Sequence, residues 1–195
     1  MAVGAAAYEQ GSLGRAVGAE PILAVAPGTF QTHAALVVGG QWQLLGQVAS
    51  STGAWSSINV EPATAILSHL LSEAARRHGP VTRLVLATPP EKPVGDFLLK
   101  AASATGVADV ELVPDHVAAV LDPANGPDFP DGAFVLACDL GARWSAGLVR
   151  VAGDHTTAVE RHTCPAEQED LQGAVRWLVD TCRRLAATIR SEYAF

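Results

Sequence analysis

The chain has few cysteines and little charge, and each shortage excludes a class of protein. Its three cysteines, Cys138, Cys164 and Cys182, are odd in number and lack metal-type spacing. This excludes a disulfide scaffold and indicates buried thiols in a reducing cytoplasm. Charged residues make up only 17% of the chain and hydrophobic residues 49%, which excludes a disordered protein. With 195 residues, the chain can bury a core as one large domain or two small lobes.

Basic residues are scarce and scattered. Thirteen Lys and Arg against twenty Asp and Glu give a net charge of -7, with no basic cluster. This composition argues against nucleic acid or an anionic membrane as the main partner. No apolar run reaches transmembrane length, and the apolar Met1–Ala7 lacks the basic start of a signal peptide. We therefore expect a cytoplasmic protein, and the Ala, Val, Leu, Arg and Gly bias resembles a high-GC bacterial proteome.

Hydrophobic periodicity predicts the element order βββ-α-β-α-β-α, then a loop, then βββ-α. The expected strands cover residues 22–26, 32–39, 42–48, 84–87, 110–113, 133–138, 144–151 and 155–163. The expected helices cover residues 2–10, 62–78, 94–104, 115–121 and 165–193, the last with Glu167, Glu169 and Asp170 in its first turn. The Pro- and Gly-rich residues 122–132 are the best internal boundary. We therefore predict an N-terminal helix and linker (1–20), a first lobe (21–122) and a reduced second lobe (123–195).

The stretch Val135–Val149, VLACDLGARWSAGLV, is the most informative one. Two apolar segments flank a short turn that contains Gly141, which predicts a β-hairpin with Asp139 at its mouth. A carboxylate at a strand end, followed by Gly where a backbone approaches closely, suits a phosphate or a hydrated metal ion. The alternative is a capped surface turn in a β-meander.

Four motifs occur in the order found in one large superfamily. Asp139-Leu140-Gly141 is similar to a phosphate loop D-L-G-G-G-T, and residues 24–30 (AVAPGTF) fall where that superfamily has its other phosphate loop, D-L-G-T-T. Residues 86–90 (LATPP) resemble the strand end T-V-P-A, and residues 111–121 (ELVPDHVAAVL) resemble I-N-E-P-T-A-A-A-L. The chain thus resembles the actin, sugar-kinase and heat-shock ATPases, most closely the nucleotide-binding domain of seventy-kilodalton heat-shock chaperones. The Ala-rich residues 2–11 are similar to a helix that closes the far end of that domain.

The resemblance implies an α/β actin-like (ribonuclease-H-like) architecture, with one complete βββαβαβα lobe and a reduced βββα second lobe. It implies ATP or ADP with Mg²⁺ as candidate cofactors. If the chain is an ATPase, Asp115, in place of the hydrolytic Glu, and Asp139 are the catalytic candidates, and Asp139 is the candidate metal ligand. The residues expected to contact nucleotide are Gly28, Thr29, Asp139, Leu140, Gly141 and Arg143.

The departures from the family pattern are as informative as the matches. Ala26 stands where the first loop has the Asp that holds magnesium, and Ala142-Arg143-Trp144 replaces Gly-Gly-Thr in the second loop. The family's adenosine-binding glycines have no counterpart, and no Lys occurs in the region that supplies its catalytic Lys. Arg143 and Trp144 are the candidates for a repurposed site, in which Arg holds an anion and Trp stacks on a planar ligand; the alternative is a solvent-facing Arg beside a half-buried Trp.

Three functions remain. The favoured hypothesis is a non-catalytic chaperone-like or actin-like module that binds a protein partner or a second copy, with nucleotide binding weak or lost. The first alternative is an ATP-binding chaperone-type ATPase that uses Asp139-Leu140-Gly141. The second is a metal-dependent ribonuclease-H-like nuclease, which Ala26 and the acidic composition disfavour.

Several other residues carry simpler expectations. Cys138 lies in an apolar strand, which predicts an inert core thiol. His33, His116, His155 and His162 lack metal-ligand spacing. The last predicted helix presents Trp177, Leu178, Leu185 and Ile189, which either pack on their own sheet or form an interface.

Overall fold

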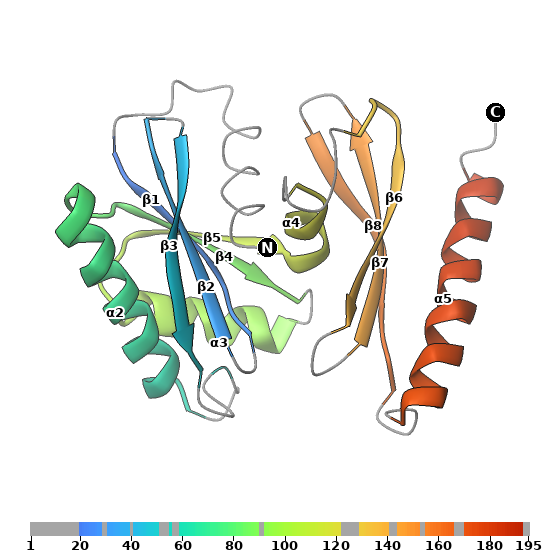
Figure 1. Ribbon diagram of the computed structural model, residues 1–195, viewed down its shortest axis with the longest axis horizontal. Helices are drawn as coiled ribbons and strands as arrows, with labels where there is room; N and C mark the ends of the chain where they lie inside the picture. Colours follow the sequence, from blue (N-terminus) through green and yellow to red (C-terminus); the bar gives the residue numbers. More distant parts are fainter. Residues whose placement is uncertain are drawn as a thin grey trace. The chain divides into compact units, whose positions relative to one another are not determined.

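The computed structural model describes residues 20–28, 31–39, 41–50, 55, 59–89, 92–121, 129–140, 144–152, 155–165 and 170–192. The chain divides into two compact units, Met1–Gly126 and Pro127–Phe195. Within the described ranges, the elements follow in the order that hydrophobic periodicity predicts (Figure 1). The helix expected over residues 2–10 lies outside the described residues.

The first unit is built on a five-stranded sheet in the order β3-β2-β1-β4-β5. Strand β1 pairs antiparallel with β2 and parallel with β4, and β4 pairs parallel with β5. Because β1 is central, each of its five residues is buried. The strands are β1 Ile22–Ala26, β2 Gln31–Val38, β3 Gln41–Ala49, β4 Arg83–Thr88 and β5 Asp109–Pro114.

Two helices cover one face of this sheet, and a third follows its last strand (Figure 1). Helices α2 (Glu61–His78) and α3 (Lys92–Ser103) pack against a core that β1, β2 and β4 supply on alternate residues. Leu67 of α2 is completely buried there, a placement that contributes about 1.5–3 kcal/mol for a leucine. The short helix α4 (Asp115–Leu121) contacts β4 and β5.

Short-range interactions define the two ends of α2. The Asn59 side-chain oxygen accepts a hydrogen bond from the Glu61 backbone N–H at 3.0 Å, and Pro62 lies in the first turn. At the other end, Gly79 has a φ of 90° and donates its N–H to the Ala75 carbonyl at 2.9 Å. A positive φ is readily adopted only by glycine, so this residue ends the helix.

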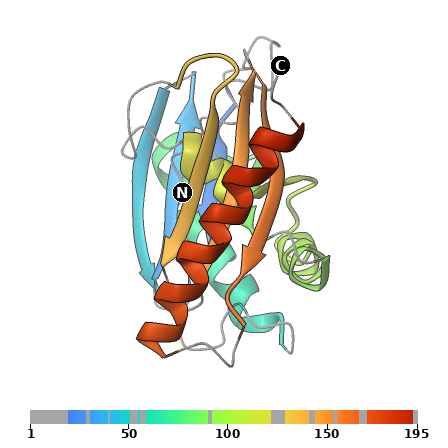
Figure 2. The same cartoon turned by 90° about the vertical axis from the view of Figure 1, so that its right-hand side faces the viewer.

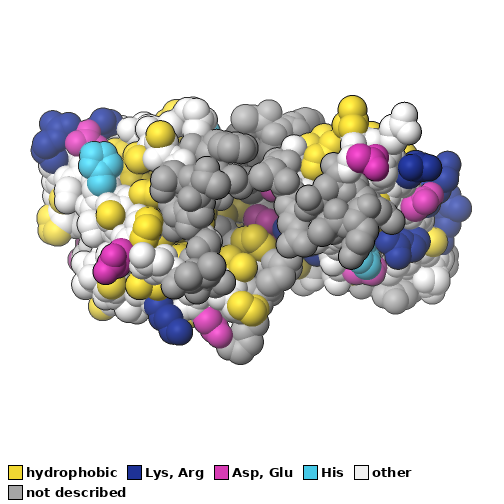
Figure 3. Space-filling view, turned by 90° about the horizontal axis from the view of Figure 1, so that it is seen from below, with side chains coloured by type: hydrophobic (Ala, Val, Ile, Leu, Met, Phe, Trp, Pro, Cys, Tyr) yellow, Lys and Arg dark blue, Asp and Glu magenta, His cyan; other side chains and the backbone are white. Residues whose placement is uncertain are grey.

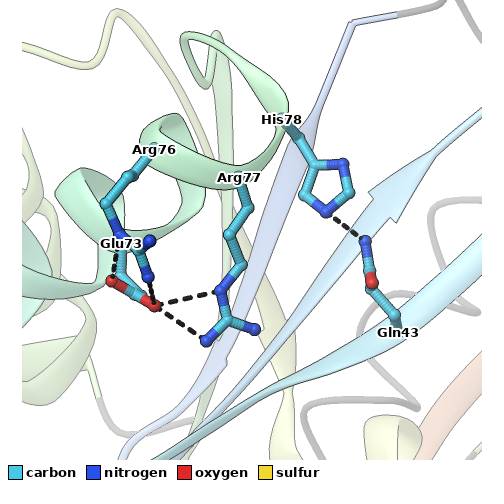
Figure 4. A network of polar contacts seen from close by, with 5 residues as sticks. All are labelled: Gln43, Glu73, Arg76, Arg77 and His78. Atoms are coloured by element: carbon cyan, nitrogen blue, oxygen red, sulfur yellow. Dashed lines mark hydrogen bonds and ion pairs between the residues drawn. The ribbon is translucent and has the colours of Figure 1, made fainter.

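A polar network lies at the last turns of α2 (Figure 4). The Glu73 carboxylate accepts hydrogen bonds from the Arg76 guanidinium at 2.7 and 3.1 Å and from Arg77 at 2.7 and 2.9 Å. These two cations lower the pKa of Glu73 from 4.5 to about 2, and Glu73 in turn raises the pKa of Arg76. The His78 ring is hydrogen-bonded to the Gln43 side chain, which ties the helix end to β3.

The second unit has a three-stranded sheet and one long helix. Strands β6 (Phe134–Leu140), β7 (Trp144–Ala152) and β8 (His155–Thr163) form an antiparallel meander. The hairpin predicted within Val135–Val149 is confirmed as the β6–β7 pair. Helix α5 (Leu171–Glu192) crosses one face of the sheet (Figure 2), and the buried Trp177 and Leu185 form the core between them.

The predicted start of the last helix is wrong. Helix α5 begins at Leu171 and has no acidic residue in its first turn. Asp170 precedes the helix, and its side chain accepts a hydrogen bond from the Gly173 N–H at 2.7 Å, as an N-terminal cap does. Glu167 and Glu169 lie outside the described residues. None of the described helices is long and apolar enough to cross a membrane.

Candidate functional site

Buried polar side chains of the first unit gather at one edge of its sheet. Because β1, β4 and β5 are parallel, their last residues, Ala26, Thr88 and Pro114, lie at the same edge. The antiparallel β2 begins there. Every buried polar side chain described in this unit belongs to this edge, namely Thr32, Thr88, Asp115 and His116. Burying polar groups costs free energy unless they are paired, so this edge is the candidate site of the first unit.

The predicted first phosphate loop coincides with the turn from β1 to β2. Ala26 is buried at the end of β1, opposite His33. A Cβ on Gly28 would lie 2.3 Å from the Gln31 carbonyl oxygen, so only glycine fits this turn. Thr29 lies outside the described residues.

A hydrogen-bonded cluster beside this turn escaped the sequence reasoning. The Thr32 hydroxyl lies 2.7 Å from the Ser50 hydroxyl and accepts a hydrogen bond from the Trp55 indole N–H at 2.9 Å. These residues join the start of β2 to the segment after β3. The signal available in the sequence was Thr32 itself, a polar residue within an apolar strand that needs a partner.

Asp115 and His116 form a buried pair at the start of α4. The Asp115 Oδ1 atom accepts a hydrogen bond from the His116 backbone N–H at 2.7 Å and lies 3.2 Å from the His116 Nδ1 atom. The side chain of His116 is 5% exposed, and its Nε2 atom has no hydrogen-bond partner among the described residues. With the proton on Nδ1, Nε2 is an acceptor. The family resemblance predicts a role for Asp115, whereas His116 lacks metal-ligand spacing, so the sequence predicts no role for it.

The described residues of this edge do not fit a magnesium-bound nucleotide. Ala26 offers no carboxylate at the end of β1, and the Asp115 carboxylate is engaged by His116. The Thr88 hydroxyl donates to the Pro89 carbonyl at 2.9 Å. Among the described residues, no three His, Cys, Asp or Glu side chains form a group that could hold a metal ion.

The predicted second phosphate loop belongs to the second unit and is described only in part. Asp139 is half-buried in β6 and lies opposite the buried Ser145, whereas Leu140 is 55% exposed. Trp144, considered above for stacking on a ligand, packs against the core under α5. Gly141 and Arg143 lie outside the described residues. Gly28 and Asp115 belong to the first unit.

The expectation of three buried thiols is wrong for two of them. Cys138 is exposed and Cys182 is half-buried, whereas Cys164 is buried. Cys138 is not an inert core thiol because β6 is an edge strand, so one of its flanks has no neighbouring strand among the described residues.

An apolar surface borders this edge strand. Leu136 and Leu140 lie opposite Leu148 and Trp144 in the ladder, on the face that α5 covers elsewhere. Three exposed apolar residues that are four positions apart form a stripe along one side of α5. We define the β6–α5 surface as Leu136 and Leu140 of β6 with Leu171, Val175 and Val179 of α5, all of them exposed. The four residues expected on α5 (Trp177, Leu178, Leu185 and Ile189) pack on their own sheet.

Charges are mixed on the face shown in Figure 3. Basic side chains (dark blue) and acidic side chains (magenta) are interspersed there. Among the described residues, this face therefore offers no continuous basic surface of the kind that binds nucleic acid.

No protein-family profile and no curated protein sequence matches this chain. Solved structures do match it, and three examples follow. MreB5 of Spiroplasma citri, solved bound to ADP, is 16% identical over 89% of this chain and 57% of its own, with a TM-score of 0.54. YeaZ from Pseudomonas aeruginosa is 12% identical over 74% and 67%, with a TM-score of 0.49. The PPX-GPPA enzyme of Aquifex aeolicus is 12% identical over 87% and 64%, with a TM-score of 0.47.

The likeness to MreB5 shows the fold alone, and that fold is the actin-like ATPase fold. The architecture implied by the motif resemblance is therefore confirmed. The chain spans 57% of the length of MreB5 and 64% of the length of the PPX-GPPA enzyme.

Proposed function

We propose that the chain is a non-catalytic, chaperone-like or actin-like module of a bacterial cytoplasm that binds another polypeptide through the β6–α5 surface. The observation that carries the proposal is this surface. Five of the eight large apolar side chains exposed among the described residues belong to it, although the second unit is the smaller one. An apolar patch beside an open strand edge favours a protein partner.

The first unit supports a specific kind of partner. In the first unit, β1 is the first strand of a βββα motif, as β6 is in the second unit. The edge of β1 that does not pair with β2 pairs with the parallel strand β4. Five of the six residues of β4 are buried. We infer that the partner supplies an extended apolar strand to the open edge of β6, with its side chains against Val175 and Val179.

The residues at the strand ends of the first unit support the non-catalytic part of this proposal. Preorganised charges usually provide the largest catalytic contribution to phosphoryl transfer. Ala26 removes the carboxylate that the family places at the end of β1, and Asp115 is engaged by His116. Nucleotide binding in this proposal is therefore weak or lost.

A fluorescent peptide of residues 82–89, TRLVLATP, tests the proposal because it contains the strand that pairs with β1. We expect saturable binding in fluorescence anisotropy and slower hydrogen exchange of the β6 amides. Val179→Asp abolishes both effects. Leu44→Asp, which changes an exposed apolar residue of the edge strand β3, is the matched control and keeps them.

Two results decide the matter. Absence of peptide binding, together with a monomer at every concentration in sedimentation, would overturn the proposal. Self-association that Val179→Asp abolishes and Leu44→Asp leaves intact identifies a second copy of this chain as the occupant.

A nucleotide-binding ATPase of the heat-shock chaperone type is the second candidate. The observation that favours it is the ADP bound to MreB5, which shares this fold. This candidate uses Asp139-Leu140-Gly141 as its phosphate loop, as the family resemblance implies. Calorimetric titration with ATP and ADP in the presence of Mg²⁺ separates the two candidates, because tight binding that Asp139→Ala abolishes would support the ATPase and contradict the non-catalytic module.

A further inference from the structure

Two of the three thiols meet between α5 and its sheet. Cys138 lies opposite Ala146 in the β6–β7 ladder, so both side chains are on the same face of the sheet. Ala146 belongs to the core under α5. Cys182 follows Leu178 by four residues and precedes Leu185 by three, so all three side chains lie on one side of the helix. Cys182 therefore lies on the side of α5 that faces the sheet, as Cys138 lies on the sheet face that carries Ala146.

The thiols of Cys138 and Cys182 interact directly. The pKa of Cys138 is raised from 9.0 to about 11, first by partial burial and then by the Cys182 side chain, which is also its hydrogen-bond partner. A thiol with such a pKa is almost entirely protonated at neutral pH, and the thiolate is the reactive form. Cys138 therefore reacts slowly near neutral pH and faster in alkali.

Access differs among the three cysteines. Cys138 is exposed, and Cys182 is half-buried beside it. Cys164 is 2% exposed, and its Sγ atom lies 3.7 Å from the Pro165 carbonyl oxygen. Cys164 is thus an internal control for oxidation.

We propose that Cys138 and Cys182 are a redox site that forms a reversible disulfide, with a low-molecular-weight disulfide such as oxidised glutathione as the oxidant. The Cys138 thiolate attacks one sulfur of the oxidant, the S–S bond of the oxidant breaks, and one glutathione thiolate leaves. The Cys182 thiolate then attacks Sγ of Cys138 and releases the second glutathione. The two cysteines lose two electrons to the oxidant, and the two released thiolates take up the two protons.

The bond links residues that are 44 positions apart and fastens α5 to the edge strand. A cross-link of this kind restricts the unfolded chain and stabilises the folded one. The inference goes beyond the proposed function, because its test requires no partner.

Peptide mass spectrometry without reduction tests the inference on the full chain. After incubation with oxidised glutathione in mild alkali and alkylation of free thiols, we expect one intramolecular link between Cys138 and Cys182. Cys164 stays free and is alkylated only after unfolding. Reduced glutathione in excess reverses the link. A Cys138–glutathione adduct that accumulates unresolved, a link to Cys164, or only intermolecular dimers would each overturn the inference.

Two further measurements use the Cys138→Ser variant as control. The rate of disulfide formation should rise about tenfold per pH unit below pH 10. The reason is that the thiolate fraction of Cys138, with a pKa of about 11, increases about tenfold per pH unit in that range. Oxidation raises the melting temperature of the wild type and leaves that of Cys138→Ser unchanged. A pH-independent rate, or an equal shift in both proteins, contradicts the proposed pair.

Discussion

Strands β1 and β6 are each the first strand of a βββα motif, but they differ in how deeply they are buried. All five residues of β1 are buried, whereas β6 alternates between half-buried and exposed residues. Both segments are mainly apolar, ILAVA and FVLACDL. The difference comes from their neighbouring strands. Strand β1 lies between β2 and β4, whereas β7 is the one strand that pairs with β6 within the described ranges. The comparison teaches that an apolar run predicts a strand, and only the tertiary arrangement decides whether that strand becomes core or interface.

The largest expected effect compares one leucine from each of the two strands. Leu23 of β1 is completely buried, so Leu23→Ala should lower the free energy of unfolding by about 2–5 kcal/mol. Leu136 of β6 is 38% exposed, so Leu136→Ala should cost about 1 kcal/mol or less. Urea denaturation followed by circular dichroism measures both. Equal losses with unchanged denaturant slopes would show that β6 is as buried as β1, and the comparison would fail.

The next effect compares the two carboxylates selected from the sequence. Asp115→Ala leaves the buried N–H of His116 without its acceptor, so the free energy of unfolding should fall by about 1–3 kcal/mol. Asp139 is only half-buried, and Asp139→Ala should cost less. Asp115→Asn, which keeps an acceptor oxygen, is the control and should cost less than Asp115→Ala. The same denaturation assay ranks the three variants, and a larger loss for Asp139→Ala would reverse the interpretation.

The sequence was enough to predict the element order and most strand bounds, because apolar periodicity is a local property. Residues 22–26 are a strand as predicted, and 144–151 differs from β7 by one residue. The predicted start of α5 is wrong because acidic residues are favourable both just before a helix and in its first turn. The side chain of Asp170 caps the helix from the position before it.

The sequence predicts the candidate site only for the residues that come directly after a predicted strand. The resemblance placed residues 24–30 and Asp115 at the ends of β1 and β5, and these ends share one edge. The bond between Thr32 and Trp55 joins residues 23 positions apart, and periodicity contains no information on such pairs. The exposure of Cys138 likewise depends on its position in β6, which is an edge strand among the described strands, and no local sequence pattern reveals this.

The smallest expected effect compares the helices that cover the two sheets. On α2, Glu73 accepts hydrogen bonds from both Arg76 and Arg77, whereas on α5 Arg183 meets Asp180 at a single distance of 3.4 Å. We expect Arg76→Ala with Arg77→Ala to raise the pKa of Glu73 from about 2 toward 4.5, as measured by NMR titration of its carboxyl carbon.

The sign of the accompanying stability change follows from the lowered pKa of Glu73. Because this pKa is below its unfolded value of 4.5, the contribution of Glu73 is fully present above pH 4.5 and is lost as the pH falls through about 2. The contribution is small because the network is exposed to solvent and salt. Arg183→Ala, the control on α5, leaves the titration of Glu73 unchanged. A wild-type Glu73 that titrates near 4.5 would mean that the two helix surfaces do not differ in solution, and the contrast between α2 and α5 would then rest on their apolar faces alone.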